Sequence, residues 1–305
     1  MGGGKHEDQV DQRFDQGSSE WTKEKERCGG TDRPFASYGP YELRAGEEGI
    51  EIRADGEILG VYPGYISLKE DRALLELDKG MLLEISEGGI REILSPEKTL
   101  LLSFIASDGN IRYTQERPCY QLRFGSKSDE LRGLFRESME TAYDLTPGEY
   151  RHKDKEHFFE MITSSKEAAA DAMKYINKHG SDYWEVPSRY MDKEAARAWL
   201  KGFMSGDGSI GYYPNFGGLS VRFCSKYREG LEEIAQLLDG YFGIESRIYP
   251  REKELDPKRG KYELCINKNE HQIRFVAEIG SYKRSHQEAI DRFFEDRWKR
   301  FHRKE

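Results

Sequence analysis

The chain has 305 residues, enough for two domains, and its 36% apolar and 34% charged residues are typical of a water-soluble protein. No run approaches the roughly 18 apolar residues of a membrane-spanning helix, and no signal peptide is recognisable, which argues against a membrane or secreted protein and predicts a cytoplasmic one. The four cysteines are too widely spaced for a zinc site or a disulfide framework, as expected in a reducing compartment.

The net charge of −8 is unfavourable for a nucleic-acid partner, but it is unevenly distributed. Residues 1–95 contain 12 Lys and Arg against 21 Asp and Glu, a net charge of −9. The remaining residues therefore carry a net charge of +1. Because the acidity belongs to the N-terminal third, it does not exclude nucleic-acid binding by the rest of the chain.

The N-terminal third predicts two segments. Residues 1–36 are Gly-rich and charged without apolar periodicity, so we expect a disordered or loosely packed leader. Residues 37–95 contain short alternating runs such as YELRA, GIEIRA and MLLEIS between Gly and Asp turns. This pattern predicts an acidic, β-rich accessory module, acting as a stabilising cap or as a binding module.

Residues 96–181 predict a helix, two strands, a helix, two strands and a helix. Ser95 and Pro96 form a helix start, with an N-cap followed by proline at the first helical position. The runs NIRYTQ and YQLRF alternate as an antiparallel pair does. Apolar residues spaced three and four apart then mark the buried face of a second helix, at Leu131, Leu134, Phe135, Met139 and Ala142.

Residues 182–305 repeat this order after a linker, with Asp192 as the N-cap of the first helix. An offset of 99 residues relates Asp207 to Asp108, and it also relates four further pairs: Arg222 to Arg123, Phe223 to Phe124, Ser225 to Ser126 and Lys226 to Lys127. The chain is therefore an internal duplication. An additional amphipathic helix is expected at the end, with Ile290, Phe293, Phe294, Trp298 and Phe301 on its apolar face.

Each half opens with a similar stretch, KTLLLSFIASDGNI at residues 98–111 and AARAWLKGFMSGDGSI at residues 195–210. Both are apolar helices with small residues four apart, Ser103 and Ser107 or Gly202 and Gly206, and both end in Asp-Gly. A helix C-terminus carries partial negative charge, so an added carboxylate is unfavourable unless a cation is nearby. Two such ends favour a metal site over a simple capping turn.

The motifs LLSFIASDG and LKGFMSGDG, their spacing and the order of elements resemble the single-chain, two-motif LAGLIDADG homing endonucleases, over about residues 95–305. The resemblance implies an α+β fold: a duplicated αββαββα unit with two antiparallel, saddle-like sheets, here with a small N-terminal β-rich module. It also implies that the small motif residues let the two motif helices pack closely. The earlier acid of each motif is replaced, by Ala106 and by Ser205.

The resemblance also implies a catalytic centre. Asp108 and Asp207 are the expected ligands of Mg²⁺ or Mn²⁺, with the backbone carbonyls of Ser107 and Gly206 as further candidates. The family's basic catalytic position matches Lys268, whereas the first half has Ser165 in that place. Lys127 and Lys226 match the polar position that supports metal-bound water in the family. A solvated surface charge is the alternative role for each lysine.

Basic residues on the predicted strand faces and hairpin loops are candidate DNA contacts, since Arg reads guanine and both Arg and Lys bind phosphate. They are Arg112, Arg123, Arg222, Arg247, Arg251, Lys153, Lys155 and Lys258.

The sequence thus predicts a sequence-specific, metal-dependent double-strand DNA endonuclease that acts as a monomer with internal pseudo-twofold symmetry. A protein of the same fold that binds nucleic acid without cutting it remains the alternative, either a maturase acting on intron RNA or a DNA-binding regulator. The replaced first acids and Ser165 favour this alternative, and the retention of both Asp108 and Asp207 favours the nuclease.

Overall fold

The structure is a computed structural model, and it describes residues 34, 36–46, 49–63, 65–114, 119–153, 155–178, 183–215, 218–251 and 262–302. The predicted leader, apart from residues 34 and 36, lies outside the described residues. Within them the predicted mixed helix and strand architecture is confirmed.

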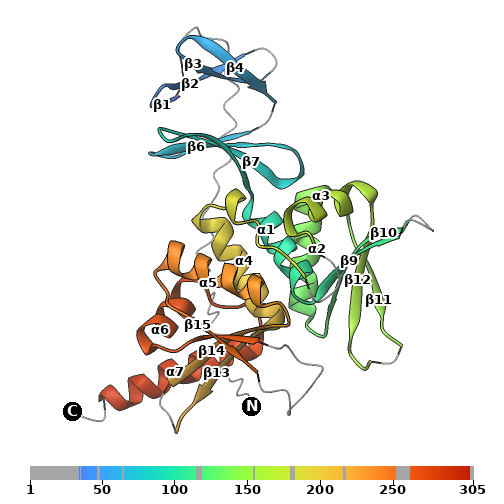
Figure 1. Cartoon of the computed structure of the whole chain (residues 1–305), viewed down its shortest axis with the longest axis vertical. Helices are drawn as coiled ribbons and strands as arrows, with labels where there is room; N and C mark the ends of the chain where they lie inside the picture. Colours follow the sequence, from blue (N-terminus) through green and yellow to red (C-terminus); the bar gives the residue numbers. More distant parts are fainter. Residues whose placement is uncertain are drawn as a thin grey trace, which may run out of the picture.

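Two four-stranded antiparallel sheets form the N-terminal part, at the top of Figure 1. The first sheet has the order β1-β2-β3-β4 and consists of Ala36–Tyr38, Tyr41–Ala45, Ile50–Ala54 and Glu57–Tyr62. The second has the order β5-β6-β7-β8 and consists of Ile66–Leu68, Arg72–Glu76, Met81–Ser86 and Gly89–Leu94. Alternate residues from both sheets, among them Leu43, Ile52, Leu75 and Ile85, pack into one small core.

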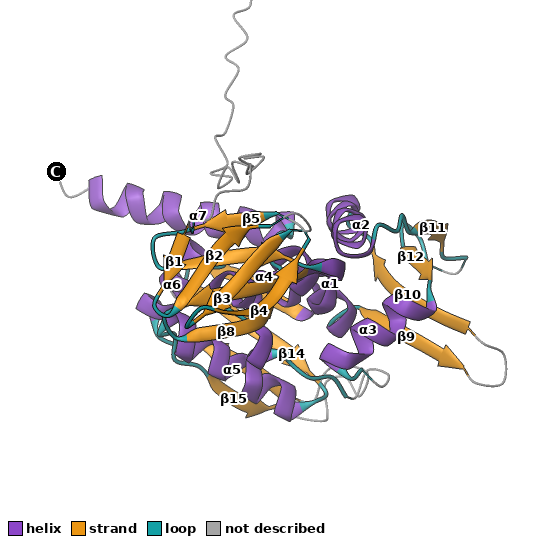
Figure 2. Ribbon diagram, turned by 90° about the horizontal axis from the view of Figure 1, so that it is seen from above, coloured by secondary structure: helices purple, strands orange, loops and turns teal. Residues whose placement is uncertain are grey.

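The first repeat follows in the predicted order, with helices on one face of a sheet. Its helices are α1 (Pro96–Ala106), α2 (Asp129–Tyr143) and α3 (Lys166–Ile176). Its strands are β9 (Gly109–Thr114), β10 (Cys119–Ser126), β11 (Gly148–Arg151) and β12 (Phe159–Ser164), in the spatial order β11-β12-β10-β9. Figure 2 shows these strands to one side of α1 and α3.

The second repeat has the same order and the same sheet topology. Its helices are α4 (Lys193–Asp207), α5 (Arg228–Phe242) and α6 (Asn269–Glu278), followed by α7 (Arg284–His302). Its strands are β13 (Gly208–Tyr213), β14 (Gly218–Ser225), β15 (Arg247–Pro250) and β16 (Tyr262–Ile266), in the spatial order β13-β14-β16-β15. The duplication inferred from the sequence is therefore a structural duplication.

Both motif helices begin at the predicted caps. The Ser95 side chain accepts a hydrogen bond from Lys98 N at 3.2 Å, and Asp192 Oδ1 accepts one from Ala195 N at 2.9 Å. Asp192 also pairs with Arg72 of β6, with Oδ2 3.2 Å from Nη2. The N-terminal sheets are thus joined to the start of α4 by an ion pair between buried and half-buried side chains.

The motif helices α1 and α4 lie side by side between the two repeats (Figure 1). Gly202 and Gly206 are fully buried at their contact. A Cβ atom built on Gly202 would lie 1.9 Å from Ser103 Oγ, and one on Gly206 would lie 2.3 Å from Ser107 Oγ. These distances are too short for any side chain, so the small residues are what allows the two helices to approach.

The predicted final amphipathic helix is present as α7, and its apolar face is only partly covered. Ile290 and Phe293 are buried against the second repeat, and Phe293 stacks edge-on with Tyr212 at 5.9 Å. Phe294 and Trp298, however, are 44% and 67% exposed. The apolar face of α7 is therefore only partly covered, because α7 extends beyond the sheet against which it packs (Figure 1).

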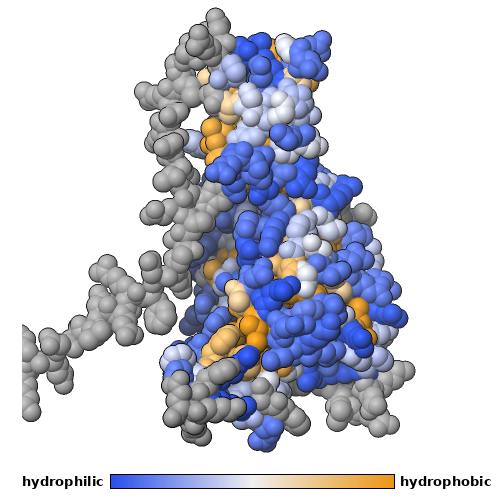
Figure 3. Space-filling model, turned by 90° about the vertical axis from the view of Figure 1, so that its left-hand side faces the viewer, coloured by the Kyte–Doolittle hydropathy of each residue, from blue (hydrophilic) through white to orange (hydrophobic). Residues whose placement is uncertain are grey.

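The surface on the side of the second repeat is mostly hydrophilic, with hydrophobic patches between the hydrophilic areas (Figure 3). No helix in the described ranges is long and apolar enough to cross a membrane.

Candidate functional site

Asp108 and Asp207 lie where the two motif helices pass into strands. Asp207 is the last residue of α4, and β13 begins at the next residue; Asp108 follows the end of α1 and directly precedes β9. A Cβ atom on Gly206 would lie 3.4 Å from Asp108 Oδ2. The carboxylate from one repeat therefore touches the helix end of the other, and the two acids meet at a single junction.

The environment of the two aspartates disfavours two negative charges. Both residues remain accessible to water at the surface. The surrounding protein atoms nevertheless replace part of the water around each carboxylate, and this desolvation raises the pKa of Asp108 and of Asp207. At Asp207 the neighbouring Asp108 carboxylate raises the pKa further. Residual contact with water moderates these shifts without changing their direction. A cation at the junction would relieve the repulsion.

Lys178, which our sequence analysis did not select, supplies one such cation. It is 3% exposed, and its Nζ donates to the backbone carbonyl of Ala106 at 2.6 Å and to that of Ser107 at 3.4 Å. Burial lowers the pKa of Lys178 to about 8, against the attraction of Asp207 and Asp108. The ammonium group thus occupies the C-terminal end of α1, where unpaired carbonyls favour positive charge.

Lys283 is a second cation that our sequence analysis missed. Its charge lowers the pKa of both Asp108 and Asp207 against the effect of burial. Lys178 follows α3 and Lys283 follows α6, so each comes after the third helix of its repeat. That shared position in the duplication is the sequence signal that could have identified them.

A buried hydrogen-bond network anchors the segment that carries Lys283. Ser205, the residue in place of the motif's earlier acid, bonds Ser281 Oγ at 3.0 Å and accepts from Tyr282 N at 2.8 Å. Ser281 Oγ in turn lies 2.8 Å from His286 Nδ1 and accepts from Lys283 N at 3.2 Å. Replacement of the acid by serine therefore ties α4 to the segment between α6 and α7.

The two carboxylates fit a divalent metal whose remaining coordination positions are filled by water and by oxygens of the substrate. Mg²⁺ in proteins is commonly held by one or two carboxylates, with water and phosphate oxygens in the other positions. Asp108 and Asp207 provide two carboxylates, and no group of three or more His, Cys, Asp or Glu forms a denser cation site in the described part of the chain. One of the predicted carbonyl ligands, that of Ser107, accepts a hydrogen bond from Lys178.

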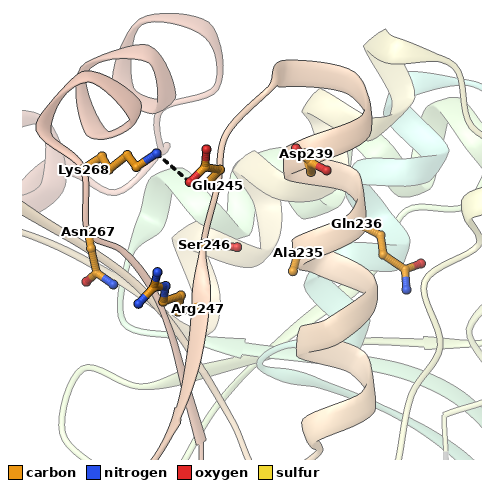
Figure 4. Close-up of a pocket in the computed structure, with 8 residues that line it drawn as sticks. All are labelled: Ala235, Gln236, Asp239, Glu245, Ser246, Arg247, Asn267 and Lys268. Carbon is orange, nitrogen blue, oxygen red and sulfur yellow. Dashed lines mark ion pairs between the residues drawn. The ribbon is translucent and has the colours of Figure 1, made fainter.

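The structure places Lys268 away from this junction. It directly precedes α6, and its Nζ lies 2.7 Å from Glu245 Oε2 beside α5, in the pocket drawn in Figure 4. Gly208, next to Asp207, pairs with Phe223 of β14. Along β16, Lys268 lies beyond Ile266, which pairs with Val221 rather than with Phe223. The strand therefore leads toward Lys268 in the direction away from Asp207.

Lys127 and Lys226 lie nearer to the helix ends. Lys127 is two residues beyond Gly125, whose N–H donates to the Asp108 carbonyl at 3.5 Å. Lys226 follows the last residue of β14, three residues beyond Phe223. Both lysines are exposed. Their positions are related by the duplication, and their catalytic role remains a prediction.

The predicted DNA contacts on the sheets share the face opposite the helices. Leu122 and Phe124 of β10 are fully buried, and Arg123 between them projects from the other face, as Arg222 does between Val221 and Phe223 in β14. Arg222 and Arg247 both lie opposite Cys265 in the register of the second sheet, so they flank the same position. Arg112 is exposed on β9, opposite Gln121.

Each of these faces also carries an acid. Glu160 lies 4.0 Å from Arg123, measured from Oε2 to Nη1. Glu263 lies 3.6 Å from Arg222 Nη1 and 3.2 Å from Arg251 Nε. These two acids were not among the residues predicted from the sequence, and they partly neutralise the arginines.

The predicted loop contacts are exposed where the structure describes them. Lys153 and Lys155 lie in the turn between β11 and β12, and Lys155 Nζ is 4.6 Å from the centre of the Phe158 ring. Lys258 lies outside the described residues.

Comparison with known proteins identifies part of the second repeat. Residues 194–280 match the model of the LAGLIDADG-like domain family. No curated protein matches the sequence. Among solved structures, the chain is similar to mesophilic variants of the homing endonuclease I-DmoI, with 20% identity over 60% of this chain and 88% of that chain and a TM-score of 0.47.

Two further solved structures are similar to the chain. One is I-DmoI in complex with DNA and Mn, with 19% identity over 61% of this chain and 96% of that chain and a TM-score of 0.47. The other is full-length DUF199/WhiA from Thermatoga maritima, with 17% identity over 67% of this chain and 61% of that chain and a TM-score of 0.44. The LAGLIDADG likeness predicted from the motifs is thus shown for the second of them: the chain carries a LAGLIDADG-like domain at residues 194–280.

Proposed function

We propose that this protein is a DNA endonuclease that binds a double-stranded target across its two repeated sheets and hydrolyses phosphodiester bonds with Mg²⁺ or Mn²⁺. The observation that carries the proposal is that the helix ends next to Asp108 and Asp207 abut: a Cβ atom built on Gly206 would lie 3.4 Å from Asp108 Oδ2. Neither repeat provides such a pair alone. One chain supplies both acids, so we propose that it acts as a monomer.

The residues at the junction suit phosphodiester hydrolysis. Asp108 and Asp207 would hold the metal, which when bound supplies Lewis-acid activation and stabilises charge on phosphate oxygens. Lys178 and Lys283 provide positive charge within electrostatic reach of both acids. A phosphate group drawn to the junction would meet these ammonium groups, which favours charge build-up on its oxygens.

The strand faces suit DNA recognition. Arg123, Arg222 and Arg247 lie on the sheet faces opposite the helices, where side chains project at regular spacing, and Arg251 follows the end of β15. Arginines presented in this way can contact phosphates and guanine edges. The near-neutral charge of residues 96–305 makes binding depend on these local clusters and hence on salt concentration.

The test is cleavage of a plasmid library that carries a randomised segment. The full-length protein with Mg²⁺ or Mn²⁺ should linearise a subset of plasmids that share one sequence, and Asp108→Asn and Asp207→Asn should each abolish this linearisation. Asp239→Asn, at an exposed position in α5, is the matched control for the loss of one carboxylate charge. Failure of the wild-type protein to cut any plasmid at any metal concentration would contradict the proposal.

The second candidate is a DNA-binding protein of the same fold that does not cut. The hydrogen bond from Lys178 to the Ser107 carbonyl favours it, because a fixed ammonium group there could replace the metal permanently. Selection of bound sequences from the same library separates the two functions. Enrichment of one sequence without cleavage supports the second candidate, and enrichment of an RNA competitor in place of DNA would support a role with intron RNA.

A further inference from the structure

The Lys178 ammonium group occupies the carbonyl end of α1, next to the proposed metal ligand Asp108. Its Nζ is 2.6 Å from the Ala106 carbonyl oxygen and 3.4 Å from that of Ser107, at the end of α1 beside Asp108. These oxygens are among the unpaired carbonyls that a helix end offers to a cation. A divalent ion that used the Ser107 carbonyl would share this oxygen with the ammonium group, and the repulsion between the two cations would weaken its binding.

The position of Lys178 is built by the fold. Asn177 ends α3 in the left-handed conformation, with φ of 42°, and its N–H donates to the Met173 carbonyl at 2.9 Å. Asn177 Nδ2 also donates to Glu185 Oε1 at 2.9 Å. Helix α3 ends at this cap, and the side chain of the next residue, Lys178, reaches the end of α1. With 3% exposure, the side chain is an internal component of the junction.

Lys283 makes a different arrangement in the second repeat. Its charge acts on the same two aspartates, but its hydrogen bonds run through the backbone, including one from its N–H to Ser281 Oγ. Among the described residues, no hydrogen bond joins its ammonium group to a carbonyl of α1 or α4. Both lysines therefore act electrostatically on Asp108 and Asp207, but only Lys178 is hydrogen-bonded to the end of α1. Each lysine serves as a control for the other.

We infer that Lys178 is an internal cation that competes with the divalent metal for the end of α1, so that the DNA-free protein binds metal weakly and the metal enters only when DNA draws Lys178 away. This inference rests on the proposed function, since it assigns the metal site to Asp108 and Asp207. Metal binding then depends on bound DNA. A nuclease that takes up its metal only in the DNA complex has no metal-activated site when DNA is absent.

The test is a titration of the full-length, DNA-free protein with Mn²⁺. The electron paramagnetic resonance signal of free Mn²⁺ measures how much of the metal is bound. Lys178→Met should bind Mn²⁺ about tenfold more tightly than the wild type, because it removes both a charge and the group that fills the site. Lys283→Met, which removes only a nearby charge, should change the affinity by less than about threefold. Lys178→Arg should stay close to the wild type.

Two double variants localise the effect. Adding Asp108→Asn or Asp207→Asn to Lys178→Met should abolish the gain. An equal gain in Lys178→Met and Lys283→Met, or no gain in Lys178→Met, would overturn the inference. Cleavage is scored separately: tighter Mn²⁺ binding by a protein that never cuts DNA leaves the inference standing and removes the nuclease proposal.

Thermal unfolding covers the case in which Lys178→Met is unstable. Without its internal cation, the variant should unfold at a lower temperature than the wild type, and saturating Mn²⁺ should restore more stability to the variant than it adds to the wild type. A variant that fails to fold with Mn²⁺ as well as without it would contradict the inference, because the metal would then not substitute for the ammonium group.

Discussion

Gly202 of α4 faces Ser103 of α1 so closely that a Cβ atom on the glycine would lie 1.9 Å from the serine Oγ. One turn later, Gly206 faces Ser107 in the same way, at 2.3 Å. The two contacts set the separation of the motif helices, and through it the meeting of Asp108 and Asp207. The small residues are therefore needed both for the packing of the two helices and for the placement of the two carboxylates.

Gly202→Ala should destabilise the protein by about 1–3 kcal/mol or more, because the added methyl group overlaps Ser103 in a packed interface. Urea unfolding measures the change. Gly240 is a matched control, since it lies in helix α5 and a Cβ atom there meets nothing within 4 Å. Gly240→Ala should stabilise by about 0.5–1 kcal/mol, as expected for alanine in a helix. Equal effects at the two positions would show that the helices have room to separate.

His286 predicts a dependence of stability on pH. It is 5% exposed, and burial, reinforced by the charge of Lys283, lowers its pKa to about 4. The unfolded chain therefore binds a proton below pH of about 6.5 that the folded protein does not bind. Stability should be fully present above that pH and fall by at most about 3 kcal/mol as the pH drops toward 4.

Urea unfolding at a series of pH values between neutral and acidic tests this dependence. His286→Gln, which keeps a hydrogen-bonding side chain next to Ser281, should show a shallower loss of stability over the same range. Parallel curves for the two proteins would mean that another group causes the acid sensitivity.

We expect the native Glu263 carboxylate to weaken nonspecific DNA binding. It pairs with Arg222 and Arg251 on the uncovered face of the second sheet. Glu263→Gln should free both arginines and raise affinity for random-sequence duplex several-fold at low salt, with a steeper dependence on salt concentration. Fluorescence anisotropy at several salt concentrations measures both quantities. Glu229→Gln, an exposed residue in α5, controls for the change in net charge, and an equal gain there would remove the role of Glu263.

Much of the fold could be predicted from the sequence because local signals agreed with the tertiary structure. Ser95 and Asp192 are N-caps, the strands alternate, and the duplication aligns the halves. The exposure of Phe294 and Trp298 could not be predicted, because helical periodicity gives the apolar face of α7 but not the length of the surface beneath it.

The candidate site was predicted only in part. Asp108 and Asp207 stand out because the same residue ends both motif helices. Lys178 and Lys283 have no local signal, since each follows a helix in an irregular segment and reaches the junction only through tertiary packing. Lys268 lies next to the end of a strand, and the sequence does not tell which end of that strand approaches Asp207; in the structure Lys268 pairs with Glu245.

The two halves of the junction should contribute unequally to cleavage. Lys178 is bonded to the end of α1, and within the described residues no lysine makes the same contact with the end of α4. Asp108→Asn and Asp207→Asn should therefore leave different residual rates of nicking on the two strands of a cognate site. Duplexes labelled on one strand at a time resolve the two rates, and equal residual rates would indicate a symmetric centre.

Cleavage of a selected duplex by the wild type, Asp108→Asn and Asp207→Asn, in Mg²⁺ and in excess chelator, tests the central claim most directly. The account predicts that only the wild type with metal makes a double-strand break and that both variants still bind the duplex. A break made by the wild type in excess chelator, or by both variants at the wild-type rate, would contradict a metal-dependent centre at Asp108 and Asp207.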